Sequence, residues 1–426
     1  MAFILIKGLL KPKCPNKHHI IIFYRNFIYC DVDIIIPMIK AIIMAGGKGS
    51  RIRPLTLSRP KPLIPVANRP IIDYIIQKLK ANNYTDLVFT LSYLKNHITK
   101  LLEKEHQDLN INYSIEKSPL GTAGGVKNAQ KYLDDTFFVL SGDVLLDVDL
   151  DHLLKFHQEK NALATILLTP VKDPTHFGIA VLDNDNQVIK FLEKPSSDQV
   201  FSKIANTGTY ILEPEIFDYI DEIPGNKKGE IDFSKDVFPK LIQEKASIYG
   251  YILDGYWNDV GRPESFLKAN RDVLNKKIRP RPHGKIMKEC VGKFGDIWAG
   301  KNVQIEEKVR IIGPVVIGDN AVIKKGCVLG KNTVIGEKVQ VEEHTHIQGS
   351  VILPDSIIKA HSYLKDCIID SKCILERGCV LEKGVILGSS VQMGPYSLVK
   401  SNRSITNKIE ILRDSIIDSD YPIETE

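Results

Sequence analysis

The sequence lacks a long apolar run, closely spaced cysteines and a strong net charge. No apolar stretch approaches the roughly 18 to 20 residues that cross a bilayer, so we expect no membrane-spanning helix and no membrane partner. The net charge of +5 is small for 426 residues, which argues against nucleic acid as a partner. The seven cysteines are odd in number and form no Cys-x-x-Cys pair, which argues against a disulfide framework or a zinc site. These absences favour a soluble protein of the reducing cytoplasm.

The composition leaves room for more than one domain. With 43% hydrophobic and 26% charged residues, the chain can bury a substantial core, and we expect it to divide into two units. Residues 1–37 differ from the rest, because two short apolar patches separated by lysines and histidines suit neither a signal peptide nor a regular helix. We expect Met38 to be the initiator, so that residues 1–37 are upstream sequence outside the fold. The alternative is an arm that binds a membrane surface or a partner.

The most informative segment is a glycine loop that ends an apolar run. Residues 41–45 read as a buried strand, and Gly46, Gly47 and Gly49 follow them. Glycines let backbone N–H groups approach an anion closely, and cationic side chains nearby suit phosphate oxygens. Those side chains are Arg51, Arg53 and Lys61. The segment predicts a phosphate site, against the alternative of an ordinary glycine turn with a basic face.

Two better-known glycine loops do not fit this segment. A Walker loop needs a lysine directly after its last glycine, whereas Lys48 precedes Gly49. The dinucleotide fingerprint needs a third glycine where the chain has Ile52. The loop therefore belongs to another class of phosphate site.

Short apolar strands alternate with segments of helical spacing from Met38 to about Leu274. This alternation predicts a Rossmann-like α/β domain over residues 38–274, with a doubly wound, mostly parallel sheet and helices on both faces. Ligands of such sheets bind beyond the carboxyl ends of the strands. The predicted helices include residues 72–79 and 98–102, and the predicted strands include 87–91, 137–140 and 248–253.

A carboxylate stands at the tip of one predicted strand. Residues 137–140 lead directly into Ser141, Gly142 and Asp143. An aspartate in this place can hold Mg²⁺ by one oxygen while the ion bridges phosphate oxygens. The alternative is a structural aspartate that caps the next helix.

These elements together resemble the signature of the sugar-1-phosphate nucleotidyltransferases, the pyrophosphorylases that make nucleotide sugars. The matching strings are GGKGSRIRP at 46–54 and PKPLIP at 60–65. The string from Leu55 to Pro70 is most similar to the mannose-1-phosphate guanylyltransferase branch. A further match, GYWNDVG at 255–261, contains an aspartate between an aromatic residue and a glycine. The resemblance implies Mg²⁺ held by Asp143 and Asp259, and catalysis by Arg51, Lys61, Asp143 and Asp259.

The resemblance also implies two substrate sites. Glu116 lies in a second glycine-rich loop that would hold the nucleobase, although a plain helix entry is the alternative. The Glu193-Lys194 pair would contact the sugar phosphate, a weak signal by itself because such pairs are abundant on surfaces. The implied nucleotide-binding residues are Gly46, Gly47, Gly49, Glu116 and Gly121, and the implied sugar-phosphate-binding residues are Gly178, Glu193, Lys194, Asn206 and Thr207.

The implied reaction joins a nucleoside triphosphate to a sugar 1-phosphate and releases pyrophosphate. GTP and mannose 1-phosphate, giving GDP-mannose, are the first choice of substrates. The alternatives are a glucose-1-phosphate thymidylyl- or uridylyltransferase, a bifunctional N-acetylglucosamine-1-phosphate uridylyltransferase/acetyltransferase, and a non-catalytic regulatory homologue. A non-catalytic homologue tends to lose the phosphate-binding and metal-binding residues, and this chain has them.

A repeat of six residues occupies the C-terminal part of the chain. Residues 275–298 look like an extended linker with prolines and solvated charges, with an anion-binding tail as the alternative. Beyond it, aliphatic residues recur at every sixth position, which predicts a left-handed parallel β-helix over 299–426. The predicted inward row is Ile305, Ile311, Ile317, Ile323, Leu329, Ile335, Val341, Ile347 and Leu353, with a frame slip after Leu353 and a resumption at Ile369.

The β-helix suggests roles of its own. Cys367, Cys373 and Cys379 hold a small-residue position of the repeat, so we expect them to be packing residues. The faces and ends of the coil can pair subunits, which predicts a homo-oligomer. Acyl transfer is the competing function, and its candidate general bases are His344, His346 and His361.

Overall fold

The computed structural model describes the backbone of residues 18–20 and 32–34, and residues 39–47, 49–92, 94–282, 284–287 and 295–421. Residues 1–39 form one unit and residues 40–426 another. In the first unit, β1 (His18–Ile20) and β2 (Val32–Ile34) pair antiparallel. Met38 and most of residues 1–37 lie outside the described residues, so the expectation about the initiator stays a prediction. In the described part of the chain, no helix combines the length and the apolar character needed to span a bilayer.

A parallel sheet forms the half of the first domain that carries the glycine loop. Its strands run in the order β8-β3-β6-β7, each parallel to its neighbour. Ala41, Ile42 and Ile43 of β3 are all fully buried, as a central strand covered on both faces requires. The predicted strands and helices of this half are confirmed as β3 (Lys40–Met44), α1 (Ile71–Ala81), β6 (Asp86–Leu91), α2 (Lys95–Glu105) and β8 (Phe137–Ser141). This half also contains β7 (Asn110–Ile115) and α3 (Gly121–Asn128).

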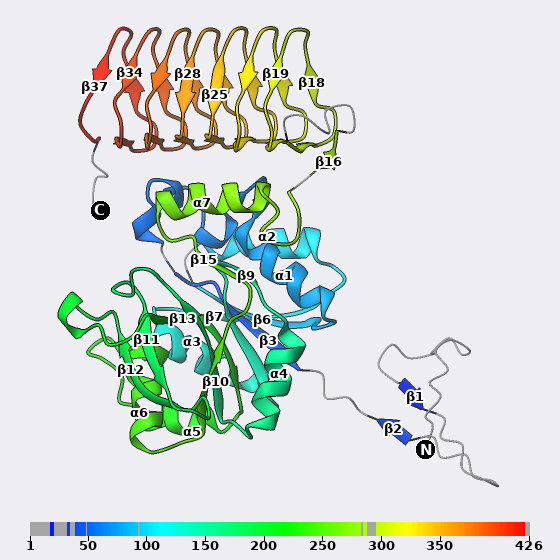
Figure 1. Ribbon diagram of the computed structural model, residues 1–426, viewed down its shortest axis with the longest axis vertical. Helices are drawn as coiled ribbons and strands as arrows, with labels where there is room; N and C mark the ends of the chain where they lie inside the picture. The colour runs from blue at the N-terminus through cyan, green and yellow to red at the C-terminus, as the bar shows by residue number, and fades with distance from the viewer. Residues whose placement is uncertain are drawn as a thin grey trace. The chain divides into compact units, whose positions relative to one another are not determined.

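The other half of the sheet is largely antiparallel, so the expectation of a mostly parallel sheet does not extend to it. β13 lies antiparallel to β8, β10 and β11, and β11 lies antiparallel to β12. Only β14, the strand predicted at 248–253, adds a parallel pairing there, with β10. This half comprises α4 (Leu150–Glu159), β10 (Ala164–Pro170), β11 (Gly178–Leu182), β12 (Val188–Glu193), β13 (Ile204–Leu212), α5 (Ile216–Asp221), α6 (Phe238–Gln243) and β14 (Ile248–Ile252). Figure 1 shows both halves of the sheet with their helices.

Short elements between the sheet and the C-terminal repeat complete the first domain. They are η1 (Ser50–Ile52), η2 (Leu55–Leu57), η3 (Lys61–Leu63), β4 (Pro65–Val66), β5 (Arg69–Pro70), β9 (Val144–Asp147), β15 (Tyr256–Asp259) and α7 (Pro263–Leu274). The sequence pattern does not separate β15 from the strand before it. β15 instead pairs antiparallel with β9 in a two-stranded sheet.

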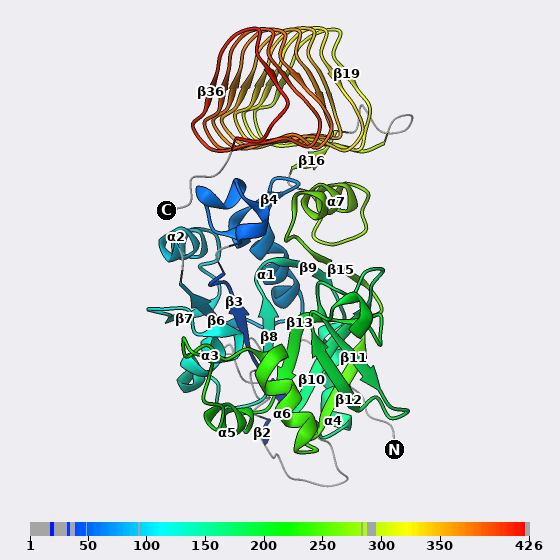
Figure 2. The same ribbon diagram turned by 90° about the vertical axis from the view of Figure 1, so that its left-hand side faces the viewer.

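The C-terminal repeat forms a parallel β-helix, as the hexapeptide period predicts. Each strand pairs with the third strand after it, which gives three sheets with three strands to a coil. Figure 2 shows the coils stacked on one another. One sheet, which we call the docking sheet, consists of β17 (Ile297–Ala299), β20 (Val315–Ile317), β23 (Thr333–Ile335), β26 (Val351–Ile352), β29 (Ile368–Ile369), β32 (Ile386–Leu387) and β35 (Ser404–Ile405), with β16 (Lys285–Ile286) antiparallel at its edge.

The other two sheets of the β-helix have the same parallel pairing. The second comprises β18 (Gln304–Ile305), β21 (Val322–Ile323), β24 (Gln340–Val341), β27 (Ile357–Ile358), β30 (Ile374–Leu375), β33 (Gln392–Met393) and β36 (Glu410–Ile411). The third comprises β19 (Arg310–Ile311), β22 (Val328–Leu329), β25 (His346–Gln348), β28 (Tyr363–Lys365), β31 (Val380–Leu381), β34 (Leu398–Val399) and β37 (Ile416–Ile417).

The frame slip lies earlier than the sequence predicts. The inward row runs from Ile347 to Ile352 rather than to Leu353, and a second slip separates Leu364 from Ile369. Because neighbouring strand residues point to opposite faces, removing one residue turns the next side chain outward. Leu353 therefore packs outside the coil, and its prediction as an inward residue was wrong.

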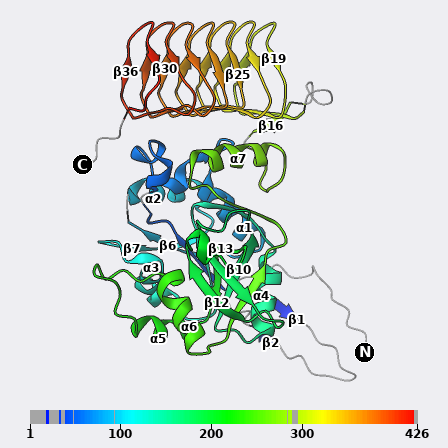
Figure 3. The same ribbon diagram turned by 60° about the vertical axis from the view of Figure 1, so that its left-hand side comes forward.

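The outer face of the docking sheet packs against the first domain. Val316, Val334 and Val351 are fully buried there, although they point away from the coil interior. Their partners on the first domain include Leu55, Ile64 and α7, which lies beside the coil in Figure 3. The docking sheet is thus apolar on both faces, as a sheet between two cores requires.

Candidate active site

A cleft of about 470 Å³ lies beyond the carboxyl ends of the central parallel strands. This is where the strand pattern predicts a ligand site. Its lining includes eight of the residues that the sequence analysis singled out, together with Gly261, the second residue after Asp259. The eight are Gly46, Gly47, Gly49, Arg51, Lys61, Glu116, Gly121 and Asp143.

The glycine loop begins where β3 leaves the sheet. The Ala45 N–H donates to the Thr90 carbonyl at 3.0 Å, which holds the start of the loop against β6. Gly49 has a φ of 61°, the left-handed region that favours glycine. A Cβ atom on Gly47 would meet no atom within 4 Å, so this part of the loop faces open space. Lys48 lies outside the described residues.

The cationic centre of the cleft is Lys61, held between two carboxylates. Its Nζ atom lies 2.6 Å from Asp143 Oδ2 and 3.1 Å from Asp259 Oδ1. Asp143 is the second residue after the end of β8, whereas Asp259 ends β15, where it pairs with Val144 of β9. The antiparallel pairing of β15 with β9 therefore brings two carboxylates that are far apart in sequence to one point.

The charges of this centre shift each other's pKa. Burial by itself would lower the pKa of Lys61, since its side chain is only 6% exposed. The two carboxylates outweigh burial and raise that pKa above its usual value. Burial opposes ionisation of Asp143 as well, but the Lys61 charge and hydrogen bonds from Lys61 and Ser141 hold the Asp143 pKa below its usual value. Lys61 and Asp143 are therefore both charged at neutral pH.

Arg51 completes the positive side of the cleft. Its Nη2 atom lies 3.8 Å from Asp259 Oδ2, and its side chain is 52% exposed. Arg51 thus faces solvent and can turn toward an anion, whereas Lys61 is buried and paired with two carboxylates. Among the described lining residues, Arg51 and Lys61 are the only lysine or arginine side chains.

Asp143 and Asp259 fit a divalent cation. Both carboxylates accept hydrogen bonds from Lys61 Nζ. A metal cation could take the place of this ammonium group between them. Oxygen donors of this kind suit Mg²⁺, which usually keeps waters and takes further ligands from a bound nucleotide. Within the described residues, no group of three or more acidic, histidine or cysteine side chains forms a dedicated metal cage.

The second glycine-rich loop enters the cleft at the start of α3. Gly121 has a φ of 79°, and a Cβ atom there would lie 2.3 Å from the Ile231 carbonyl oxygen, so the position requires glycine. Glu116 Oε2 accepts a hydrogen bond from the Leu120 N–H at 3.4 Å. Burial raises the Glu116 pKa, partly opposed by that hydrogen bond. Glu116 is therefore a partly buried acceptor at the edge of the cleft.

The residues expected to bind the sugar phosphate do not line the cleft. Glu193 ends β12 and pairs with Gly178 of β11 across the sheet. Lys194 Nζ lies 3.1 Å from Glu193 Oε1, and the lysine side chain is 55% exposed. Gly178 is required here, because a Cβ atom would lie 2.5 Å from the Phe191 ring.

Asn206 and Thr207 use their polar side chains inside the protein. Asn206 Nδ2 donates to Tyr210 Oη at 2.9 Å and to Ser234 Oγ at 3.0 Å. The Thr207 hydroxyl donates to the Leu167 carbonyl at 2.8 Å. Both side chains therefore stabilise β13. Gly208 of the same strand packs close to the side chain of Ser141, which is two residues before Asp143.

Ser141 and Asp232 are among the polar residues of the site that the sequence pattern did not indicate. Ser141 donates to Asp143 Oδ1 at 2.6 Å and orients that carboxylate. Asp232 lines the cleft and accepts a hydrogen bond from the Thr122 hydroxyl at 3.0 Å. Ser141 could have been found from its place at the end of a strand, two residues before Asp143. Asp232 carried no such signal, because only the fold brings it to the loop.

The histidines and cysteines of the β-helix do not line this cleft. The His344 and His361 rings stack at 5.3 Å, and His346 faces Tyr363 on the third sheet. Cys367, Cys373 and Cys379 are fully buried in the coil. All three belong to the apolar cluster that fills the coil, which confirms the expectation that they are packing residues.

Comparison with known proteins identifies the family. The nucleotidyl transferase family profile matches residues 40–276, more than half of the chain. The chain belongs to the nucleotidyl transferase family. A second profile, described as the GMPPB C-terminal domain, matches residues 311–419.

Individual relatives of this nucleotidyl transferase carry different substrate names. A UTP–glucose-1-phosphate uridylyltransferase of Synechocystis is 34% identical over 67% of this chain and 79% of its own length. A mannose-1-phosphate guanyltransferase of Candida albicans is 37% identical over 64% of this chain and 73% of its own. A crystal structure from Bacillus anthracis, assigned as a glucose-1-phosphate thymidylyltransferase, matches with a TM-score of 0.51 and 27% identity, over 57% of this chain and 97% of its own. The family is therefore clear, whereas its members differ in sugar and base.

Proposed function

We propose that this protein transfers a nucleotidyl group from a nucleoside triphosphate to a sugar 1-phosphate, forming a nucleotide sugar and pyrophosphate. The observation that carries the proposal is Lys61 Nζ held between Asp143 and Asp259 in a cleft lined by the glycine loop. A triphosphate needs backbone amides and cations at this place, and the cleft offers both.

The protein's task in this reaction is to bring two anions together. A phosphate oxygen of the sugar 1-phosphate attacks the α-phosphorus in line, and pyrophosphate leaves. That oxygen is already ionised, so the site needs no general base. Arg51, Lys61 and the amides of Gly46, Gly47 and Gly49 would hold the triphosphate and stabilise the charge that develops in the transition state.

Asp143 and Asp259 would hold Mg²⁺, which neutralises phosphate charge and orients the leaving group when it is bound. Without nucleotide, the Lys61 ammonium lies between these two carboxylates. When Mg²⁺ binds to the carboxylates, the ammonium can turn to the triphosphate. Glu193 and Lys194 would bind the sugar phosphate, with Gly178, Asn206 and Thr207 shaping the pocket.

GTP and mannose 1-phosphate are the proposed substrates. The match of residues 311–419 to the GMPPB C-terminal domain and the similarity to a mannose-1-phosphate guanyltransferase support this choice. Glu116, the partly buried acceptor at the cleft, could receive the N1–H and the exocyclic amine of guanine, while Gly121 would let the base pack against the backbone. A uridine or thymidine nucleotide would not offer the same pair of donors to Glu116.

Pyrophosphate release tests the proposal. The protein is incubated with Mg²⁺ and each combination of four sugar 1-phosphates with GTP, ATP, UTP and dTTP. We expect the highest kcat/KM for GTP with mannose 1-phosphate, and a marked loss with GTP but not UTP in Glu116→Gln. Absence of pyrophosphate release for every pair would refute nucleotidyl transfer. A preference for glucose 1-phosphate with UTP or dTTP would refute only the choice of substrates.

The place and assembly of the protein are also proposals. The buried free thiols of the β-helix suit a reducing cytoplasm. The third sheet leaves Tyr363 40% and Ile416 64% exposed on its outer face, and we propose that the β-helix pairs subunits of a homo-oligomer. Sedimentation of the wild type and of Tyr363→Lys tests this, with a monomeric wild type as the contradicting result.

A further inference from the structure

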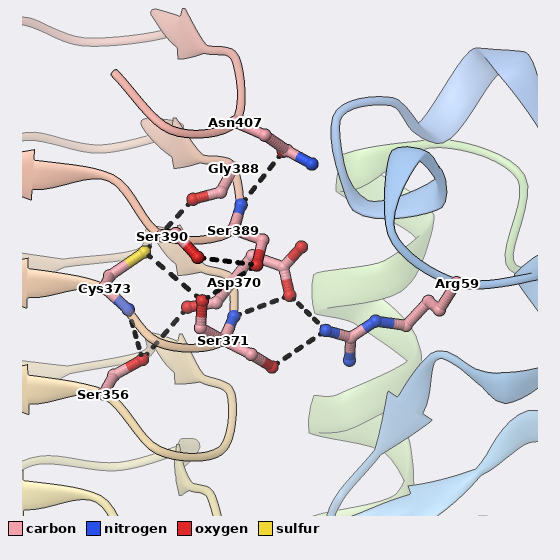
Figure 4. A network of polar contacts seen from close by, with 9 residues as sticks. All are labelled: Arg59, Ser356, Asp370, Ser371, Cys373, Gly388, Ser389, Ser390 and Asn407. Atoms are coloured by element: carbon pink, nitrogen blue, oxygen red, sulfur yellow. Dashed lines mark hydrogen bonds and ion pairs between the residues drawn. The ribbon is translucent and has the colours of Figure 1, made fainter. Parts of the chain in front are cut away.

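An ion pair to the β-helix begins two residues from Lys61. Arg59 Nη2 donates to Asp370 Oδ1 at 2.6 Å and to Ser371 Oγ at 2.8 Å, across the boundary between the two domains (Figure 4). The Arg59 side chain is 18% exposed and that of Asp370 is fully buried. Arg59 belongs to the segment that carries Arg51 and Lys61, the cationic side chains proposed to bind phosphate. Asp370 directly follows β29 of the docking sheet.

The β-helix end of this contact is firmly anchored. The Ser371 N–H donates to Asp370 Oδ1 at 2.6 Å, and the Ser356 hydroxyl donates to the Asp370 carbonyl at 3.0 Å. The Cys373 thiol donates to the Gly388 carbonyl at 3.1 Å in the next coil. Figure 4 shows these bonds as one network behind Asp370. The carboxylate that receives Arg59 is therefore fixed by the stacked coils.

The chain between Arg59 and Lys61 is short and stiff. Pro60 and Pro62 flank the lysine, and proline restricts its own φ and the conformation of the residue before it. The Leu63 N–H donates to the Pro60 carbonyl at 2.9 Å, and the Ile64 N–H donates to the Lys61 carbonyl at 3.0 Å. A shift of Arg59 is therefore passed on to Lys61 rather than absorbed between them.

The same segment touches the docking sheet on its other side. Asn68 Nδ2 donates to the Ile335 carbonyl at 2.7 Å. Leu55, Ile64 and Val66 belong to the apolar cluster that includes the outer face of the docking sheet. The segment that carries Lys61 is thus held against the β-helix by polar and apolar contacts, with Arg59 nearest in sequence to the catalytic lysine.

We propose that Arg59 is a positioning residue, and that its ion pair with Asp370 makes the β-helix the template that sets Lys61 in the cleft. The inference rests on the proposed function, in which Lys61 acts on the triphosphate. Lys61 must reach the triphosphate in the cleft, and displacement of a catalytic group by about 1 Å can cost roughly 100-fold in rate. Burial raises the pKa of Asp370 and the Arg59 charge opposes that rise, so Arg59 favours the ionised form of this carboxylate.

A second ion pair across the same boundary provides a matched control. Arg271 of α7 donates from Nη2 to Asp366 Oδ1 at 2.8 Å. Asp366 lies at the shortened corner between Leu364 and Ile369, so this pair also fixes the β-helix to the first domain. Arg271 is not part of the phosphate-binding segment. Removal of the Arg271–Asp366 pair therefore shows the effect of a weaker domain boundary on stability and turnover when Lys61 is not displaced.

The test is a double-mutant cycle read by turnover. We expect Arg59→Ala and Asp370→Asn each to lower kcat roughly 10-fold with little change in KM, and the double variant to be no slower than either single one, since both remove one interaction. Arg59→Lys, which keeps the charge, should recover part of kcat. Arg271→Ala and Asp366→Asn should lower Tm without a comparable loss of kcat. Equal kcat losses in the two pairs, or a loss in Arg59→Ala but none in Asp370→Asn, would overturn the proposal.

Amide hydrogen exchange separates this inference from the proposed function. We expect faster exchange of the amides at positions 49–63 in Arg59→Ala and Asp370→Asn than in the wild type and in the two control variants. Hydrogen exchange can be measured without turnover. If the wild type releases no pyrophosphate, the proposed function is refuted, and the exchange rates still test the positioning role of Arg59. Unchanged exchange in this segment would refute the positioning role even in an active enzyme.

Discussion

Replacement of Lys61 by methionine tests the centre of the site. Methionine has a similar length and an apolar end, so Lys61→Met removes the charge between Asp143 and Asp259 and leaves most of the packing. Loss of one preorganised charged contact typically costs about 3 kcal/mol in the transition state, or roughly 100-fold in kcat. Lys61 is 6% exposed whereas Arg51 is 52% exposed, and charges interact more strongly away from water. We therefore expect a loss of roughly 1,000-fold for Lys61→Met, larger than for removal of Arg51.

The same variant should change metal binding in the opposite direction. Without nucleotide, the Lys61 ammonium competes with a divalent cation for the two carboxylates, so its removal should tighten binding. We expect Mn²⁺, followed by electron paramagnetic resonance, to bind at least roughly 10-fold more tightly to Lys61→Met, since one unit charge is removed from the point of convergence.

The control for both measurements is Lys78→Met, which removes a lysine 3.0 Å from Asp147, outside the cleft. It should leave kcat and Mn²⁺ affinity unchanged. Wild-type turnover in Lys61→Met would refute the role of Lys61 in catalysis. Unchanged Mn²⁺ affinity would refute the idea that the lysine and the metal share one place.

Three further predictions follow from single contacts. Arg51→Ala should lower kcat roughly 100-fold or more in the pyrophosphate assay, because it removes one of the two cationic side chains that line the described cleft. Gly121→Ala should lower Tm by several degrees, since alanine in the left-handed region costs about 1 to 2 kcal/mol before any clash; Gly47→Ala, which meets open space, should keep Tm and lose triphosphate affinity. Hydrogen bonds from His157 and Thr136 outweigh burial and hold the Glu213 pKa below its usual value. The stabilisation by ionised Glu213 is therefore present at neutral pH and lost as pH falls through the acidic range. Glu213→Gln should have a lower Tm than the wild type at pH 7, and the two Tm values should approach each other near pH 3. A constant difference in Tm across this range would contradict the assignment.

The sequence by itself predicted the main elements of the parallel half of the sheet, the glycine loop after β3 and the β-helix. Residues 41–45 followed by Gly46 and Gly47 are a local pattern, because a buried strand and a glycine turn are set by neighbouring residues. The period of six in the C-terminal part also needs only a count along the chain. Asp143 was found in the same way, from its place after an apolar strand.

Only the tertiary structure decided what those elements do together. Asp259 reaches Asp143 through the antiparallel pairing of β15 with β9, which no local pattern records. Leu353 points outward because the coil loses a residue at its corner, and a one-residue slip reverses the face of a strand. Arg59 gains its partner from Asp370, more than 300 positions away. Such contacts depend on how two domains pack, so the contact between the β-helix and the segment that carries Lys61 became visible only in the folded chain.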